Sequence, residues 1–127
     1  MSDNNSNKKR ALVIEDEPII GRVCSRILTK QGFDVDVASN GLIARDMSNE
    51  ILCDLFLSDI KTPEMNGIEF YHYLKNENPE LAGRVIFITG DVLNAEVKEF
   101  LEEFKGTVLL KPFTADELKK VIEEFKK

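Results

Sequence analysis

Residues 54–67 read DLFLSDIKTPEMNG, an apolar run that stops at a carboxylate and continues into a loop. The run DLFLS has the length and the residue types of a short β-strand. Asp59 stands where the run ends, and the Pro and the Asn-Gly pair that follow it are typical of turns. This stretch therefore predicts a buried strand that presents a carboxylate at its carboxyl end.

Similar runs recur on both sides of this stretch. They are ALVI (11–14), FDVDVA (33–38), RVIFI (84–88) and TVLL (107–110). Between the runs, apolar residues recur at the three-to-four spacing of an amphipathic helix. The expected stripes are Ile19, Ile20, Val23, Ile27 and Leu28; Leu93, Val97, Phe100, Leu101 and Phe104; and Leu118, Val121, Ile122 and Phe125. Segments 40–48 and 68–75 show the same pattern less clearly.

Five strands that alternate with five helices predict an α/β fold built from βαβ units around a parallel sheet. The continuously apolar runs suit strands that are covered on both faces. The run at 33–38 alternates apolar and polar residues, so we expect it at an edge of the sheet.

Length and composition exclude several classes of protein. At 127 residues the chain has room for one domain, and its net charge of −6 argues against a nucleic-acid-binding surface. No apolar run approaches the ~20 residues of a membrane span. A single histidine, His72, and no CxxC spacing argue against a zinc site. Without a signal peptide, we expect a reducing, cytoplasmic location, with residues 1–9 as a disordered lead.

Polar residues with complementary chemistry stand where four of the apolar runs stop. Glu15 and Asp16 follow the first run, Asp59 the third, Thr89 the fourth and Lys111 the fifth. The carboxyl ends of parallel strands share one edge of the sheet, which is where open α/β sheets bind ligands. Each residue alone fits a plain strand end, a turn or a helix N-terminus. Together they predict a site.

Three clustered carboxylates require protonation or a cation, and oxygen ligands with room for water suit Mg²⁺. A lysine and a hydroxyl beside them would complete a site for phosphoryl transfer. Asp59 is the natural nucleophile, and its product would be an acyl phosphate.

The chain resembles the receiver domain of two-component response regulators. The resemblance rests on VIEDEP (13–18), LFLSDIKTPEMNG (55–67), FITG (87–90) and LLKPF (109–113), in this order and spacing. It implies that residues 10–126 form a flavodoxin-like receiver: a doubly wound, five-stranded parallel sheet of order 2-1-3-4-5 with five helices.

The resemblance also implies a role for each matching residue. Asp59 matches the phosphoacceptor; Glu15, Asp16 and the backbone carbonyl of Lys61 match the other Mg²⁺ ligands, with Asp16 as the direct one of the acidic pair. Thr89 and Lys111 match the residues that bind the phosphoryl group, and Pro112 matches a proline that usually follows a cis bond.

The implied function is to accept a phosphoryl group from a sensor histidine kinase or a histidine phosphotransfer protein, with Mg²⁺ as cofactor. The receiver would then switch a surface, formed by the last two helices and the strand at 107–110, that binds an unknown downstream protein or a second copy of the chain. It would act as a phosphoacceptor that assists its own phosphorylation and dephosphorylation, and not as a classical enzyme.

Two positions set this chain apart from the family pattern. Val108 stands where the family usually has Tyr or Phe, so an aromatic rotamer cannot report phosphorylation, and we expect Thr89 and the flexible Gly90 to carry the switch. Lys61 and Asp91, each two residues beyond a site residue, are expected to flank the mouth of the site. Their opposite charges would form a gate against water, or they would be independent solvated charges.

Two other functions fit the sequence less well. A phosphohydrolase of the haloacid dehalogenase type needs a second Asp two residues after the nucleophile, where this chain has Lys61. A docking module that works without phosphorylation predicts loss of Asp59, Asp16 or Lys111, and all three are present. Only Lys126 and Lys127 follow the last predicted helix, so we expect either a single-domain regulator or a receiver cut from a longer chain.

Overall fold

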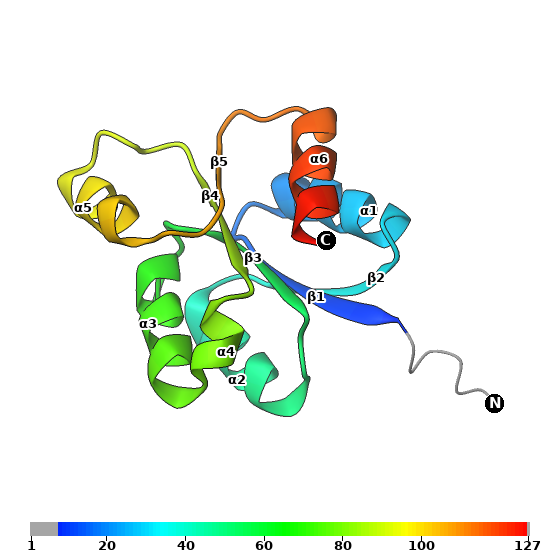
Figure 1. Cartoon of the computed structure of the whole chain (residues 1–127), viewed down its shortest axis with the longest axis horizontal. Coiled ribbons are helices and arrows are strands. Elements are labelled where there is room, and N and C mark those ends of the chain that lie inside the picture. The colour runs from blue at the N-terminus through cyan, green and yellow to red at the C-terminus, as the bar shows by residue number, and fades with distance from the viewer. Residues whose placement is uncertain (1–7, 127) are drawn as a thin grey trace.

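Five parallel strands form one sheet in the computed structural model, which describes residues 8–126 (Figure 1). The strands are β1 (Lys9–Ile14), β2 (Phe33–Ala38), β3 (Leu55–Asp59), β4 (Val85–Thr89) and β5 (Val108–Leu110). The helices are α1 (Pro18–Lys30), α2 (Gly41–Glu50), α3 (Gly67–Glu77), α4 (Pro79–Ala82), α5 (Ala95–Glu103) and α6 (Ala115–Phe125).

The strand order is β2-β1-β3-β4-β5, which confirms the predicted doubly wound topology. In this order β1 pairs with both β2 and β3, and β3 pairs with β4. Strand β2 lies at one edge, as its alternating sequence predicts, and β5 lies at the other. The central strands β1 and β3 therefore bring their carboxyl ends side by side.

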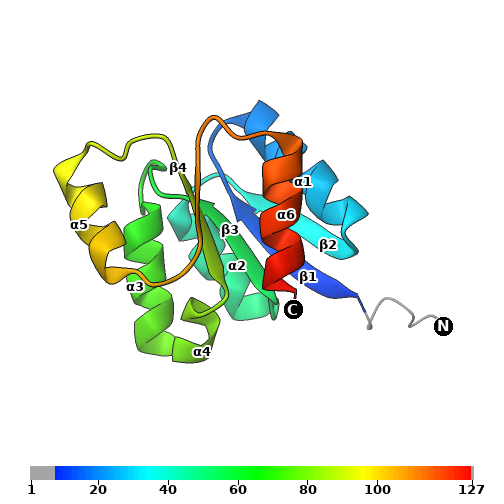
Figure 2. The ribbon, with the colours of Figure 1, turned by 45° about the horizontal axis from the view of Figure 1, so that its top comes forward.

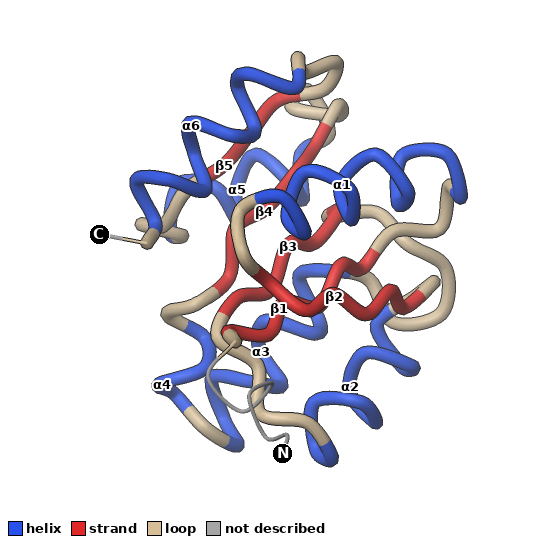
Figure 3. Tube along the Cα trace, turned by 90° about the vertical axis from the view of Figure 1, so that its right-hand side faces the viewer, coloured by secondary structure: helices blue, strands red, loops and turns tan. Residues whose placement is uncertain are grey.

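Alternate residues of each strand enter two separate hydrophobic layers. Leu12, Phe56 and Phe87 face one layer, which also contains apolar residues of α2, α3, α4 and α5. Val13, Leu57 and Ile86 face the other, which is closed by α1 and α6. Figure 3 shows α1 and α6 on one side of the sheet and α2, α3 and α4 on the other. Burial on both faces explains why these strands are continuously apolar.

Helix caps explain where several helices begin. Asn66 and Thr114 each form a capping box with the Glu three residues later, at the starts of α3 and α6. The Asn94 side chain accepts hydrogen bonds from the backbone N–H groups of Glu96 and Val97, so α5 begins at Ala95. Leu93 therefore precedes the helix and is 91% exposed. The prediction that placed Leu93 on the buried stripe was wrong.

Two further expectations need correction. The described chain has six helices because a single turn, α4, separates α3 from β4. Four residues are too few for a periodic pattern to show. On α1, Ile19 is 70% exposed and Val23 is also exposed, whereas Cys24 and Leu28 are buried. The helix is therefore rotated relative to the predicted stripe, and Ile19 and Val23 remain at the surface.

The loops after β1, β4 and β5 lie together along one edge of the molecule, which is the upper edge in Figure 2. At the opposite end of β1, the strand begins at Lys9, inside the segment 1–9 predicted as a lead, while residues 1–7 of that prediction lie outside the described residues. None of the helices between residues 8 and 126 has the length and apolarity needed to cross a membrane.

Candidate functional site

Three predicted site residues lie at the carboxyl ends of adjacent strands. Asp59 is the last residue of β3, Thr89 is the last residue of β4, and Glu15 directly follows β1. All three are buried, although each is polar. Buried polar groups are rare unless they form hydrogen bonds or ion pairs or have a functional role. The position of these three residues at one edge of the sheet therefore marks the candidate site.

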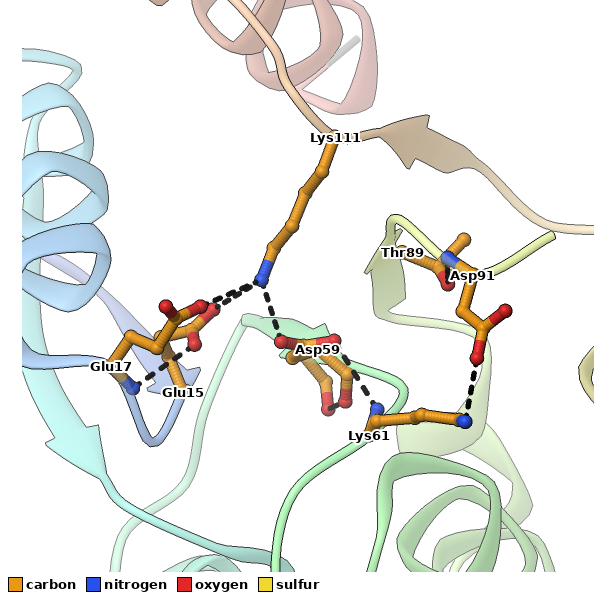
Figure 4. A network of polar contacts seen from close by, with 8 residues as sticks. Glu15, Glu17, Asp59, Lys61, Thr89, Asp91 and Lys111 are labelled. Atoms are coloured by element: carbon orange, nitrogen blue, oxygen red, sulfur yellow. Dashed lines mark hydrogen bonds and ion pairs between the residues drawn. The ribbon is translucent and has the colours of Figure 1, made fainter. Parts of the chain in front are cut away.

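Lys111, which directly follows β5, reaches this group from the neighbouring strand end (Figure 4). Its Nζ lies 2.7 Å from Oδ2 of Asp59 and 3.4 Å from Oε1 of Glu15. The Lys111 backbone N–H donates to the carbonyl oxygen of Thr89, which fixes the lysine beside β4. The peptide bond between Lys111 and Pro112 is cis, as the resemblance implied.

A third carboxylate contacts the same ammonium. Oε1 of Glu17 lies 3.5 Å from Nζ of Lys111, and Figure 4 shows Glu15 and Glu17 converging on it from the β1 side. Sequence reasoning did not select Glu17 as a site residue, although it belongs to the acidic run of residues 15–17. The run alone could not show which side chains turn toward the sheet edge.

Burial and crowding perturb the charges of the site. Burial, followed by repulsion from Asp59, raises the pKa of Glu15 from 4.5 to about 7. Burial alone would lower the pKa of Lys111, but its hydrogen bond to Asp59 and the attraction of Asp59 and Glu15 raise it overall. Lys111 is therefore firmly cationic, and one ammonium faces three carboxylates.

The donor set fits a hard divalent cation. Carboxylate oxygens of Glu15, Glu17 and Asp59 all lie within 4.8 Å of one another. Oε1 of Glu15 is buried and, apart from its 3.4 Å ion pair with Lys111, accepts no hydrogen bond from the described chain. Oxygen ligands and an excess of negative charge suit Mg²⁺. Asp16, which the resemblance implies as the direct ligand, is exposed and is not part of this group.

Lys61 and Asp91 form an ion pair at the mouth of the site. Nζ of Lys61 lies 2.6 Å from Oδ2 of Asp91. The Lys61 backbone N–H donates to Oδ1 of Asp59, and the Asp91 backbone N–H donates to Oγ1 of Thr89. The contact expected from the sequence is therefore present, and each partner is held to a site residue through its own backbone.

The residues expected to take part in switching lie around Lys111 and β5. A Cβ added at Gly90 would lie 3.3 Å from Cβ of Lys111, so the two backbones pass close together. Val108 pairs in register with Phe87 and is half-buried against the larger of the two hydrophobic layers. The side chain at this position is therefore aliphatic, and no aromatic ring is available there to change rotamer.

An apolar hollow opens beside the site, and the sequence did not reveal it. Its volume is about 530 Å³, and it is lined by Ile19, Ile20, Val23, Gly90, Lys111, Pro112 and Phe113. The exposed Ile19 lines this hollow together with Ile20, which is half-buried and also packs against the core layer beneath α1. Helical periodicity could identify α1 as amphipathic, but it could not separate side chains that fill the core from those that line a surface hollow.

Comparison with known proteins adds an independent finding. The family model of the response regulator receiver domain matches residues 11–123. The chain is 32% identical over 114 residues to the transcription factor SKN7 of Saccharomyces cerevisiae, which covers 87% of this chain and 18% of SKN7. It is 31% identical over 118 residues to the transcriptional regulatory protein CrdR of Helicobacter pylori, covering 93% of this chain and 55% of CrdR. The chain thus spans about half or less of these relatives.

Solved structures of response regulators have the same fold as this chain. A response regulator receiver domain protein from Clostridium thermocellum superimposes with a TM-score of 0.76 at 29% identity, covering 92% of this chain and 93% of that one. The response regulator TrrA from Thermotoga maritima, solved in complex with Mg(2+)-BeF, gives a TM-score of 0.77 at 26% identity and covers 92% and 98% of the two chains.

Proposed function

The chain belongs to the response regulator receiver domain family of two-component systems, and from this premise we propose that Asp59 accepts a phosphoryl group in a Mg²⁺-dependent reaction. One observation carries the proposal: Nζ of Lys111 lies 2.7 Å from Oδ2 of the buried Asp59, at the sheet edge where Glu15 and Thr89 also lie. This arrangement pairs a nucleophile with a fixed positive charge.

The donor is a phosphohistidine of a sensor histidine kinase or of a phosphotransfer protein. A carboxylate oxygen of Asp59 attacks the phosphorus, the P–N bond breaks, and the departing imidazole takes up a proton. Bound Mg²⁺ supplies positive charge that offsets the charge of the phosphoryl oxygens. Glu15, Asp16, Asp59 and the Lys61 carbonyl are the residues that would hold it.

The other site residues act on the transferred group. Lys111, already next to Asp59, neutralises a phosphoryl oxygen, and the Thr89 hydroxyl donates a hydrogen bond to another. The Lys61–Asp91 pair flanks the acyl phosphate and hinders attack by water. Because this pair is exposed, it opens and closes rapidly and sets the lifetime of the phosphoryl group without preventing its loss.

Phosphorylation would then change a partner-binding surface. Thr89 is linked through Asp91 to the loop that leads into α5, so recruitment of its hydroxyl pulls on that loop. Leu93 in this loop and Leu110 at the end of β5 are exposed apolar residues. We place the output surface, for a downstream protein or a second copy of the chain, on α5, β5 and α6.

A small-molecule phosphodonor with Mg²⁺ tests the proposal directly. Intact mass spectrometry should show the addition of one phosphoryl group to the wild type, none when EDTA removes the metal, and none in Asp59→Asn. Asp46→Asn, which removes an exposed carboxylate on α2, is the matched control and should react like the wild type. Equal labelling of Asp59→Asn and the wild type would overturn the proposal.

A further inference from the structure

Glu17 occupies a special place between the acidic pair and helix α1. It is the N-cap residue of α1, yet its side chain makes no capping hydrogen bond. Instead the carboxylate points to Lys111, while the Glu17 backbone N–H donates to Oε2 of Glu15 at 3.1 Å. Its backbone is thus tied to one site carboxylate and its side chain to the site lysine.

The cluster of Glu15, Glu17, Asp59 and Lys111 has more acidic groups than basic ones, which favours binding of a divalent cation. Glu15, Glu17 and Asp59 bring three carboxyl groups within 4.8 Å of one another, and Lys111 places a single ammonium among them. The ammonium of Lys111 lies within 3.5 Å of all three carboxyl groups, so the three converge on one point. The buried Oε1 of Glu15 supports this: apart from its 3.4 Å ion pair with Lys111, it accepts no hydrogen bond from the described chain.

We infer that Glu17 is an additional carboxylate of the divalent-cation site and raises the affinity of the unphosphorylated protein for Mg²⁺. The inference rests on the proposed function, since it takes Mg²⁺ as the cofactor. Mg²⁺ usually keeps several of its waters in protein sites. An exposed carboxylate next to the ion's site can accept hydrogen bonds from such waters without the desolvation cost that a buried ligand incurs. Glu17 is 61% exposed, in contrast to the buried Glu15.

A simpler reading makes Glu17 only a surface partner of Lys111. Exposed ion pairs of this kind contribute little to stability and are weakened by salt. The two readings differ in their effect on the cation. If Glu17 serves the cation site, loss of its charge weakens Mg²⁺ binding; if it only pairs with Lys111, its loss leaves that affinity unchanged.

Metal binding to the unphosphorylated full chain distinguishes them. Calorimetric titration with MgCl₂, with Mn²⁺ electron paramagnetic resonance as a second readout, would be applied to wild type, Glu17→Gln and Glu99→Gln. Glu99 is exposed on α5, so the control removes the same charge away from the cluster. In roughly 0.15 M KCl we expect Glu17→Gln to raise the dissociation constant roughly five-fold and Glu99→Gln to leave it within about two-fold.

A second condition separates a local ligand from a general field. In roughly 0.5 M KCl, long-range electrostatic effects are screened. If Glu17 acts locally, Glu17→Gln should still raise the dissociation constant about three-fold or more under this condition. Equal dissociation constants for Glu17→Gln and Glu99→Gln, or a ratio that falls to one in high salt, would overturn the inference. Thermal unfolding in EDTA checks that the variants are folded, and Glu17→Ala repeats the test without the Gln amide.

The outcome also separates this inference from the proposed function. If the wild type binds no Mg²⁺ or Mn²⁺, the proposed cofactor is wrong and the role of Glu17 is wrong with it. If the wild type binds the metal and is phosphorylated on Asp59, but Glu17→Gln behaves like its control, only the inference about Glu17 is wrong.

Discussion

The ammonium of Lys61 lies 2.6 Å from the carboxylate of Asp91, across the mouth of the Asp59 site (Figure 4). The two side chains are 52% and 43% exposed, and each belongs to the loop that follows a neighbouring strand, β3 or β4. The ion pair therefore connects two strand ends directly beside the buried carboxylate. On the proposed function, this pair would hinder water that attacks the phosphorus of an acyl phosphate on Asp59.

Breaking the pair should shorten the lifetime of the phosphoryl group. We expect Lys61→Ala and Asp91→Ala each to speed autodephosphorylation, by about five-fold at most, because an exposed pair contributes only ~0–1 kcal/mol. The double variant should be no faster than the faster single variant, and salt should shorten the wild-type lifetime. The measurement is the loss of phosphoryl label over time from the wild type, the two single variants and the double variant at two ionic strengths.

Lys98→Ala is the matched control, since it removes an exposed positive charge from α5 and should leave the rate unchanged. Additive effects of the two substitutions, combined with no response to salt, would show that Lys61 and Asp91 act independently.

Asp16 should be essential for the metal-dependent reaction although its side chain lies outside the observed carboxylate group. We expect Asp16→Ala to abolish Mg²⁺-dependent phosphorylation and to keep the fold, because Asp16 is exposed and lies in a loop. Circular dichroism and intact mass after incubation with a phosphodonor measure the two properties. Undiminished phosphorylation of Asp16→Ala would refute its assignment as a metal ligand and would leave Glu15, Glu17 and Asp59 as the carboxylates of the site.

The stability of the metal-free protein should depend on pH through Glu15. Its folded-state pKa of about 7 lies above the ordinary value of 4.5. Protonated Glu15 therefore stabilises the folded state; this contribution is complete below about pH 4.5 and is lost as the pH rises through about 7. Relative to Glu15→Gln, which stays neutral, the wild type should lose up to ~3 kcal/mol of unfolding free energy between about pH 5 and pH 8.

Denaturant unfolding in EDTA measures this difference. Mg²⁺ favours ionised carboxylates. Adding it at the higher pH should therefore raise the unfolding free energy of the wild type and change that of Glu15→Gln only little. Parallel pH profiles for the two proteins would show that Glu15 titrates normally.

The close approach of Gly67 to β3 predicts a stability effect at the start of α3. A Cβ at this position would lie 2.4 Å from the carbonyl oxygen of Asp59 and 3.0 Å from Cα of Ile60, so the backbone would have to move. Gly67→Ala should lower the unfolding free energy by roughly 1–3 kcal/mol and slow the phosphorylation of Asp59. Gly83→Ala is the control, since its Cβ would meet nothing closer than 3.5 Å. Equal stability of the two variants would contradict the prediction.

Particular residues show which parts of the structure the sequence could predict. Apolar runs at 11–14 and 84–88 predict buried parallel strands because a strand covered on both faces must be apolar throughout. Since parallel strands align their carboxyl ends, the polar stops at Asp59, Thr89 and Lys111 predict the site as well. In both cases one local pattern has one physical cause.

Other features depend on contacts that no local pattern records. The rotation of α1, which exposes Ile19, depends on how the helix packs against β2, where Gly21 lies close to Val37. The turn of Glu17 toward Lys111 joins residues 94 positions apart. The start of α5 was different: Asn94 is a strong N-cap residue, and this signal in the sequence outweighs the apolar character of Leu93.

Phosphorylation should reach the output surface through Thr89 and not through an aromatic ring at position 108. Oγ1 of Thr89 accepts a hydrogen bond from the Asp91 backbone N–H at 3.1 Å, so movement of this hydroxyl toward a phosphoryl group displaces the loop before α5. Phe100 of α5 packs edge-to-face on Phe87 of β4 at 5.2 Å between ring centres, and we expect the displacement of the loop to change how α5 packs there. Beryllofluoride, which mimics the phosphoryl group, should therefore shift the amide resonances of residues 90–105 and leave β2, at the far edge of the sheet, unchanged. Thr89→Ala should confine the shifts to the surroundings of Asp59, and Asp59→Asn should remove them. If the wild-type shifts stayed at Asp59 and never reached residues 90–105, this route would be wrong.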